Sequence, residues 1–188
     1  MTNNALLTIT GLFFLFFTVF SLWFLRREYR LRKKLTWAGS IVHVAMFAVH
    51  GMFCSLLVWG PETMPAMGAG AGLGIALMLV GLGVTIYAMD LFRRFSRWLG
   101  SDTPGLTTNG LYRFSRNPQF VGYGLFILGF YIVWWGALAL IGIFSYVALA
   151  YAVARMEEEH LTLVYGQSYL DYGKQVPRFF GWPYKMKS

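Results

Sequence analysis

Three consecutive glutamates stand at the end of an apolar run in this chain, within the stretch ARMEEEHLTLVYGQSY. In a helix, at about 100° per residue, Glu157 and Glu158 flank the face that carries Leu161 and Tyr165, while Glu159 points to the opposite side. A carboxylate beside a packed face is costly unless it meets a cation. The cluster therefore predicts either an ion pair within the chain or a site for a cationic ligand.

A second polar segment, GLTTNGLYRFSRNPQFVGYG (residues 105–124), leads into another apolar run. Asn117 and Pro118 are typical of a helix start, with Asn at the N-cap and Pro at the first helical position. Free backbone N–H groups at such a start, with Arg116 beside them, favour an anion such as a carboxylate. The alternative is a cap where the helix enters the membrane, whose arginine only extends to the interface.

The two segments together offer charges of both signs. S-adenosylmethionine fits them, because its amino-acid end carries a carboxylate and an ammonium and its sulfonium is cationic. Arg116 and the helix N–H groups would suit the carboxylate, and Glu157 or Glu158 would suit the ammonium. The alternative for the glutamates is an internal pair with Arg155 or with an arginine of the preceding loop.

The elements that position these segments are membrane helices. The 188 residues are 57% hydrophobic and 13% charged, and the mean hydropathy of +0.53 excludes an ordinary soluble domain. A helix needs roughly 20 apolar residues to cross the hydrocarbon core. The candidate spans are Ala5–Leu25, Trp37–Trp59, Ala66–Met89 and the long run Phe120–Val153, which breaks near Trp134-Trp135-Gly136.

These spans predict an all-α integral membrane fold with five transmembrane helices, the last two forming a tight hairpin. One domain covers residues 1–188. Within it, residues 1–89 hold the first three helices, and residues 90–188 hold a cofactor-binding loop, the hairpin and a C-terminal segment. We expect the loop between helices three and four to build a cytoplasmic cofactor pocket with the C-terminal segment. The single cysteine, Cys54, excludes an internal disulfide.

The basic residues predict the orientation of the chain. All 16 Lys and Arg residues fall in alternate loops: after the first span, between the third and fourth, and after the last. By the positive-inside rule the N-terminus faces out and the C-terminus faces the cytoplasm, in the inner membrane if the source is bacterial. The net charge of +8 is therefore explained by topology, and no nucleic-acid partner is needed.

Two other patterns are better explained by helix packing than by ligand binding. The glycines of GAGAGLG (residues 68–74) lack the spacing of a phosphate-binding loop and predict close helix packing, within the chain or in a homo-oligomer. His43 and His50 lie seven residues apart on one helix face, which is also compatible with haem. We expect packed or weakly hydrogen-bonded side chains, because the only other histidine, His160, lies at the edge of the membrane. No metal site is predicted.

The order of the motifs resembles the isoprenylcysteine carboxyl methyltransferase and phospholipid methyltransferase superfamily. The motif G-L-Y-R-x-x-R-N-P-Q-F-x-G precedes the hairpin, and E-E-x-x-L-x-x-x-Y-G-x-x-Y-x-x-Y-x-x-x-V-P-R-F follows it, over about residues 104–180. The chain departs from the family pattern at Asn117, where histidine is usual, at Phe120, where tyrosine is usual, and at Pro104, where a further histidine is usual. These departures affect the expected identity of the substrate more than the expected binding of the cofactor.

The resemblance implies an S-adenosylmethionine-dependent methyltransferase and assigns roles to residues of this chain. It implies cofactor binding by Leu106, Thr108, Gly110, Leu111, Tyr112, Arg116, Asn117, Pro118, Glu157 and Glu158. It implies catalytic roles for Arg116, Glu158 and Arg155, and substrate binding by Tyr123 and Tyr169.

The sequence thus predicts a membrane methyltransferase whose acceptor is a lipophilic or lipid-linked molecule. The methylated atom of that acceptor, O, N or S, stays open. Tyr165, Tyr169 and Tyr172 share one helix face, and the aromatic segment VPRFFGWP after them either closes the pocket or anchors the tail. Two alternatives remain: an NADPH-dependent enzyme like the sterol reductases, which have a similar YGxxYxxYxxxVP ending, and a non-catalytic helical scaffold.

Overall fold

The computed structural model describes residues 3–58, 68–90, 105–136 and 138–182, in which helices joined by turns and irregular segments account for the fold and no strand occurs. The α-helices are α1 (Asn3–Arg32), α2 (Trp37–Leu57), α3 (Ala69–Asp90), α5 (Pro118–Val133), α6 (Ala139–Tyr165) and α7 (Gln167–Gln175), with a short 3-10 turn, η1, at Gly110–Arg113. The predicted all-α fold is confirmed. Glu62 and the other residues of the predicted outer loop GPETMP lie outside the described residues.

Four of the described helices are long and apolar enough to cross a membrane, namely α1, α2, α3 and α6. The remaining apolar helix, α5, has 16 residues and is therefore about 24 Å long at 1.5 Å per residue. That is short of the roughly 30 Å hydrocarbon core, so the count of five spans stays a prediction. The break in the long apolar run falls between Val133 and Ala139, next to the Trp134-Trp135-Gly136 sequence.

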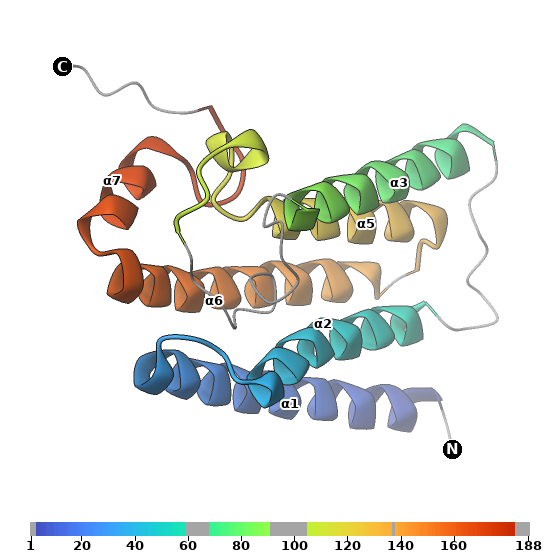
Figure 1. The fold of residues 1–188 in the computed structure, drawn as a ribbon. Helices are drawn as coiled ribbons and strands as arrows, with labels where there is room; N and C mark the ends of the chain where they lie inside the picture. Colours follow the sequence, from blue (N-terminus) through green and yellow to red (C-terminus); the bar gives the residue numbers. More distant parts are fainter. Residues whose placement is uncertain (1–2, 59–67, 91–104, 137, 183–188) are drawn as a thin grey trace.

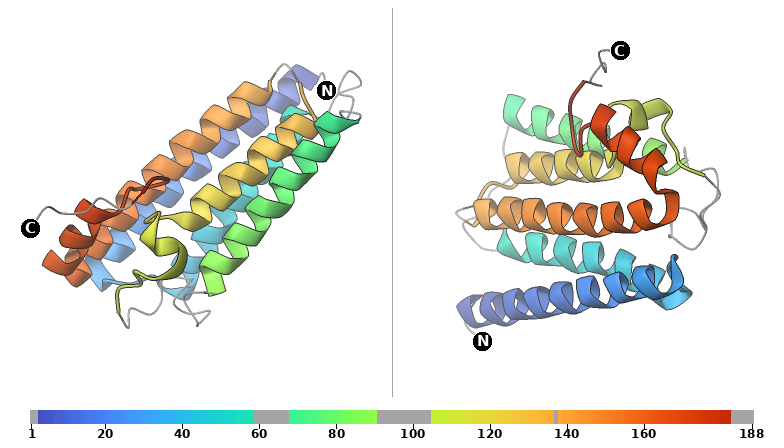
Figure 2. Two further views of the ribbon diagram at one scale, coloured as in Figure 1. Left: turned by 90° about the horizontal axis from the view of Figure 1, so that it is seen from above. Right: turned by 90° about the vertical axis from the view of Figure 1, so that its left-hand side faces the viewer.

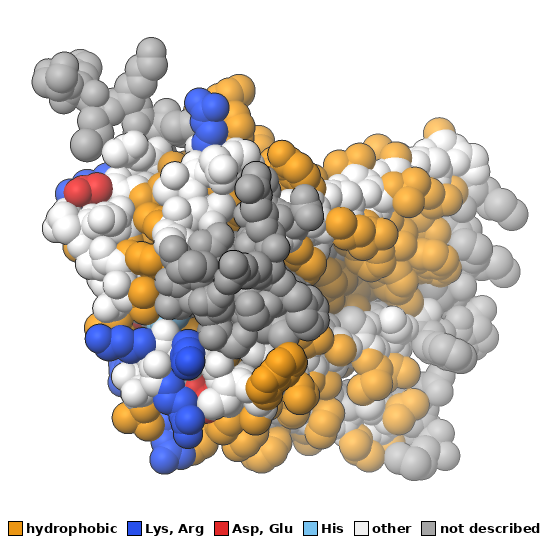
Figure 3. Space-filling model, viewed as in Figure 1, with side chains coloured by type: hydrophobic (Ala, Val, Ile, Leu, Met, Phe, Trp, Pro, Cys, Tyr) orange, Lys and Arg blue, Asp and Glu red, His pale blue; other side chains and the backbone are white. Residues whose placement is uncertain are grey.

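The helices lie side by side in one stack, with α6 between two helix pairs (Figures 1 and 2). The pair α3–α5 covers one side of α6 and the pair α1–α2 covers the other. The start of α1 and the segment that follows α7 lie at opposite ends of the stack. We call the end where α1, α3 and α6 finish the basic end, because the visible Lys and Arg side chains gather there, while many hydrophobic side chains and no Lys or Arg of the described residues are seen toward the other end (Figure 3).

Glycines allow α3 and α5 to approach backbone to backbone. A Cβ atom on Gly81 would lie 2.5 Å from the carbonyl oxygen of Gly122, and one on Gly74 would lie 2.8 Å from that of Gly129. The close packing predicted for the glycine-rich helix is therefore found inside the chain. Homo-oligomer formation through α3 remains a prediction.

The turn between α1 and α2 is closed by a buried carboxylate. Thr36 is the N-cap of α2, and its backbone N–H and hydroxyl both donate to Glu28 Oε2, at 2.8 and 2.6 Å. The Thr36 hydroxyl oxygen in turn accepts from the Gly39 N–H at 3.1 Å. This arrangement fixes the first turns of α2 beside the last turns of α1, at the basic end.

The last helix, α7, turns back across the basic end. Gly166 separates α6 from α7 with φ at +55°, in the left-handed region that glycine tolerates best. Tyr169 and Tyr172 are buried and pack with Val176 against Leu106. The helix α6 also extends beyond the predicted end of its span at Val153, so the three glutamates lie on a continuous helix.

Candidate functional site

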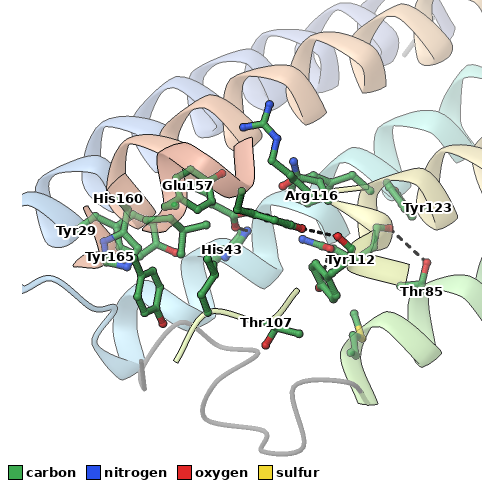
Figure 4. Close-up of a pocket in the computed structure, with 18 of the residues that line it drawn as sticks. Tyr29, His43, Thr85, Thr107, Tyr112, Arg116, Tyr123, Glu157, His160 and Tyr165 are labelled. Carbon is green, nitrogen blue, oxygen red and sulfur yellow. Dashed lines mark hydrogen bonds and ion pairs between the residues drawn. The ribbon is translucent and has the colours of Figure 1, made fainter. Parts of the chain in front are cut away.

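A cavity of about 280 Å³ opens at the basic end, near the lower limit of roughly 300 Å³ for small-molecule sites. It lies between the turns of α2, α3 and α5 nearest that end, the last turns of α6, and α7 (Figure 4). The lining residues are Tyr29, Ser40, His43, Val44, Phe47, Thr85, Met89, Gly105, Leu106, Thr107, Tyr112, Arg116, Asn117, Gln119, Phe120, Tyr123, Glu157, His160, Leu161, Tyr165, Tyr169 and Tyr172.

One wall of the cavity is held together by hydrogen bonds between segments about 60 residues apart. The Arg116 backbone N–H donates to the Pro177 carbonyl at 2.9 Å. The side-chain amide of Asn117 donates to the Arg178 carbonyl at 3.0 Å. The Tyr172 hydroxyl donates to the Tyr112 carbonyl at 2.7 Å. We call α7 together with residues 176–178 the C-terminal strap, because these bonds fasten it across the start of α5.

Asn117 is the N-cap residue of α5 and Pro118 the first helical residue, as the sequence predicts. The Asn117 side chain, however, makes no capping hydrogen bond, and the side-chain hydrogen bond that it does make is the donation to the strap. Its cap position therefore leaves N–H groups of the first turn without a side-chain acceptor.

Behind this wall, one carboxylate binds two guanidinium groups. Glu158 accepts two hydrogen bonds from Arg178, at 2.8 Å each, and lies 3.1 Å from Arg116 Nη1. This hydrogen bonding raises the pKa of Arg178. The three groups carry a surplus of one positive charge, and Nε of Arg116 is buried with no hydrogen-bond partner among the described residues. An unpaired buried donor on a cation favours an anionic ligand next to it.

Glu157 lies on the cavity wall, one residue away from Glu158. Its carboxylate is 3.7 Å from Nε2 of His43, and both side chains are less than one-fifth exposed. Among the described residues, His43 is the only basic side chain within 4.0 Å of Glu157. A carboxylate so largely removed from water, with no arginine or lysine at that distance, is suited to a cationic ligand.

Aromatic side chains surround Glu157. His160 stacks on Tyr29 with ring centroids 4.0 Å apart, and both line the cavity beside Tyr165 (Figure 4). Tyr169 also lines the cavity, and burial raises its pKa to about 12, so its hydroxyl keeps its proton at neutral pH. The site therefore combines a confined carboxylate with aromatic faces, which also attract cations.

Glu159 points away from the cavity, as the helical angles predict. It accepts three hydrogen bonds of 2.6–3.0 Å from Arg26 of α1 on the outer face of the molecule. Arg155 is exposed on the same outer face and does not reach the cavity.

The structure brings only some of the predicted site residues together. Seven of them line the cavity: Leu106, Tyr112, Arg116, Asn117, Tyr123, Glu157 and Tyr169. Six do not line it: Thr108, Gly110, Leu111, Pro118, Arg155 and Glu158. Of these six, Glu158 acts on the wall through its two arginines.

Sequence reasoning missed the portion of the wall that the first three helices supply. Tyr29, His43, Phe47, Thr85 and Met89 all line the cavity. The available signal was a histidine, His43, at the end of an otherwise apolar span, since an ionisable residue there marks a functional site by default.

The second histidine of α2 lies deeper in the bundle. His50 is fully buried and makes hydrogen-bond contacts with the Tyr123 hydroxyl at 3.1 Å and the Ser145 hydroxyl at 3.2 Å. Tyr123 in turn lines the inner end of the cavity. His50 thus fixes a cavity side chain through a polar contact inside the apolar layer.

The chain matches the family model of phospholipid methyltransferases over residues 70–168, more than half of its length. It therefore belongs to the phospholipid methyltransferase family, and the resemblance found in the motifs is confirmed.

Two kinds of relative are similar to the chain. A protein-S-isoprenylcysteine O-methyltransferase of Xenopus laevis is 33% identical over 79 residues, which are 41% of this chain and 27% of that protein. A phosphatidylethanolamine N-methyltransferase of Aspergillus terreus is 28% identical over 151 residues, which are 70% of this chain and 15% of that protein. The chain thus matches only about a quarter or less of the length of these curated relatives. No solved structure matches the chain.

Proposed function

We propose that this chain is an integral membrane methyltransferase that uses S-adenosylmethionine and acts on a lipophilic acceptor. The observation that carries the proposal is one cavity to which both polar motifs contribute, Tyr112 and Arg116 from the first and Glu157 from the second. Family membership supports methyl transfer as the reaction.

The residues of the cavity fit the cofactor's charged groups. The unpartnered Nε of Arg116 and the surplus positive charge of its cluster with Glu158 and Arg178 suit a carboxylate. Glu157, with only His43 beside it among the described basic residues, suits an ammonium or sulfonium. When bound, S-adenosylmethionine supplies a methyl carbon activated by its positive sulfur. The chain's own contribution is to hold the two reactants in line and to exclude water.

The apolar side of the cavity supports a lipophilic acceptor. Val44 and Phe47 of α2, Met89 of α3 and Phe120 of α5 line it on the side of the membrane helices. We propose that the acceptor enters from the bilayer and the cofactor from the cytoplasm, with the basic end on the cytoplasmic side and the N-terminus outside. Arg155 receives no role in this arrangement, because it lies on the outer face.

The proposal is tested by binding and by transfer. S-adenosylmethionine titrated into the purified protein should bind with a measurable heat, and a labelled methyl group should then appear in one class of fractionated membrane lipids. Binding of NADPH in place of S-adenosylmethionine would support the reductase alternative. Binding of neither cofactor, by a protein that remains helical, would support the scaffold alternative.

A further inference from the structure

The outer face of α1 and α6 carries a second hollow, separate from the cavity and larger, at about 770 Å³. We call it the arginine groove. Its walls include Arg26, Arg27 and Arg30 of α1 and Arg155 of α6, together with Trp23 and Tyr151. None of these six residues lines the cavity described above.

The groove holds more positive charge than the chain neutralises. Its one acidic residue, Glu159, is bound by Arg26 through both carboxylate oxygens and lies 3.8 Å from Arg30. Arg27 and Arg155 are exposed, and neither forms an ion pair with any described residue. Four guanidinium groups against one carboxylate leave a surplus of three positive charges within one hollow.

The polarity of the groove changes along the helix axes. Both α1 and α6 run toward the basic end (Figure 1), so Trp23 and Tyr151 lie farther from that end along the helix axes than Arg30 and Glu159. Trp23 is 57% exposed and Tyr151 is 50% exposed. Tryptophan and tyrosine prefer the level of the lipid headgroups, and an arginine just beyond them lies where a phosphate lies.

The alternative is that each arginine only extends from the hydrocarbon layer to water. That role would not require several arginines to face the same hollow. Here arginines of two helices instead face one hollow, where their mutual repulsion is unfavourable without an anion. Planar guanidinium groups bind phosphate oxygens through paired hydrogen bonds. Basic pockets between membrane helices are typical sites for acidic lipid headgroups.

We propose that the arginine groove binds the headgroup of an anionic phospholipid. The phosphate oxygens accept hydrogen bonds from Arg27, Arg30 and Arg155, and the acyl chains lie along Trp23 and Tyr151. The site goes beyond the proposed function, because it shares no lining residue with the cavity.

The test compares two lipids with the same acyl chains. Purified protein in neutral detergent is titrated with dioleoylphosphatidylglycerol or with dioleoylphosphatidylcholine, and bound lipid is counted by native mass spectrometry. We expect one tight site for phosphatidylglycerol, and a much weaker interaction with phosphatidylcholine. Equal binding of the two lipids would overturn the proposal, and so would displacement of phosphatidylglycerol by millimolar inorganic phosphate.

Variants identify the residues. Each basic residue near an acidic membrane surface contributes about fivefold in affinity, so Arg27→Gln and Arg155→Gln should each weaken phosphatidylglycerol binding by about that factor. Glu159→Gln should tighten it, because it removes the acid that competes for Arg26 and Arg30. Lys174→Gln on α7 removes the same charge from another exposed site of the basic end and should change nothing.

Wild-type affinity in both arginine variants would show that the groove does not bind the headgroup. An equal loss in Lys174→Gln would show that the lipid responds to net charge and not to the groove. A weaker affinity in Glu159→Gln would likewise contradict a site built on surplus charge. The melting temperatures of all variants are measured alongside, and since Arg27 and Arg155 are exposed and form no ion pair with a described residue, their variants should melt like the wild type.

Discussion

Glu157, Glu158 and Glu159 follow one another in the chain and meet three different surroundings. Glu157 lies on the cavity wall, Glu158 joins two arginines behind the wall, and Glu159 pairs with α1 outside. Because successive residues of a helix are about 100° apart, three neighbours necessarily point in different directions. The same residue type therefore acquires different chemistry from position alone.

These surroundings predict unequal effects on cofactor binding. Removing a carboxylate that meets a bound cation leaves that cation desolvated, a loss of roughly 2–5 kcal/mol for a buried charge pair. Glu157→Gln should weaken S-adenosylmethionine binding by at least about tenfold, since about 1.4 kcal/mol is a factor of ten. Glu158→Gln should do the same indirectly, because Arg116 and Arg178 lose the carboxylate that holds them in position at the wall.

Glu159→Gln is the matched control, with the same change on the same helical turn, and it should alter cofactor affinity little. Calorimetric titration of the three variants decides the matter. Equal, unimpaired affinity in all three would mean that the cluster only forms a charged border at the membrane.

At the scale of elements, the C-terminal strap predicts a binding defect without unfolding. Tyr172→Phe removes the hydroxyl that donates to the Tyr112 carbonyl. One such bond contributes about 0.5–1.5 kcal/mol, so the dissociation constant for S-adenosylmethionine should rise by roughly twofold to tenfold. Circular dichroism should report unchanged helix content. Lys174→Gln, on the exposed side of the same helix, serves as control, and an equal loss there would exclude the strap as the cause.

The contact between α3 and α5 predicts a difference in stability between two glycines. Gly81→Ala places a methyl group against backbone atoms of α5, including the Gly122 carbonyl. Overpacking of this kind costs typically about 1–3 kcal/mol, so the melting temperature in detergent should fall. Gly83→Ala, with nothing within 4 Å of the added carbon, should leave it unchanged or raise it slightly. Equal melting temperatures would contradict the close approach.

At the scale of the whole molecule, the distribution of basic residues predicts orientation. Every Lys and Arg lies after the first apolar run, between the third and fourth, or after the last, whether on a helix end or in a loop, so a reporter fused at Ser188 should be cytoplasmic and one inserted near Glu62 should be outside. Both positions lie outside the described residues, so the prediction rests on the sequence. A reporter signal from the outer side at Ser188 would contradict the proposed topology.

The sequence predicted those features of the site that depend on a single helix. The cap at Asn117-Pro118 and the outward direction of Glu159 follow from local rules and are found in the structure. The contact of His43 with Glu157 could not be predicted, because helical periodicity gives the faces of a helix and not the identity of its neighbours. Arg155 shows the same limit, since only the position of α1 beside α6 reveals which face of α6 it occupies.

The C-terminal strap also has a consequence for the order of assembly during synthesis. The cavity wall at Arg116 and Asn117 takes its hydrogen-bond partners from Pro177 and Arg178, about 60 residues later. At roughly 5–20 residues per second, several seconds separate translation of the two halves of the wall. The wall of the cavity therefore stays incomplete until residues 177 and 178 have been added to the chain. A chain truncated before residue 177 keeps all the described helices of membrane-spanning length and lacks the partners that Arg116 and Asn117 bind in the strap.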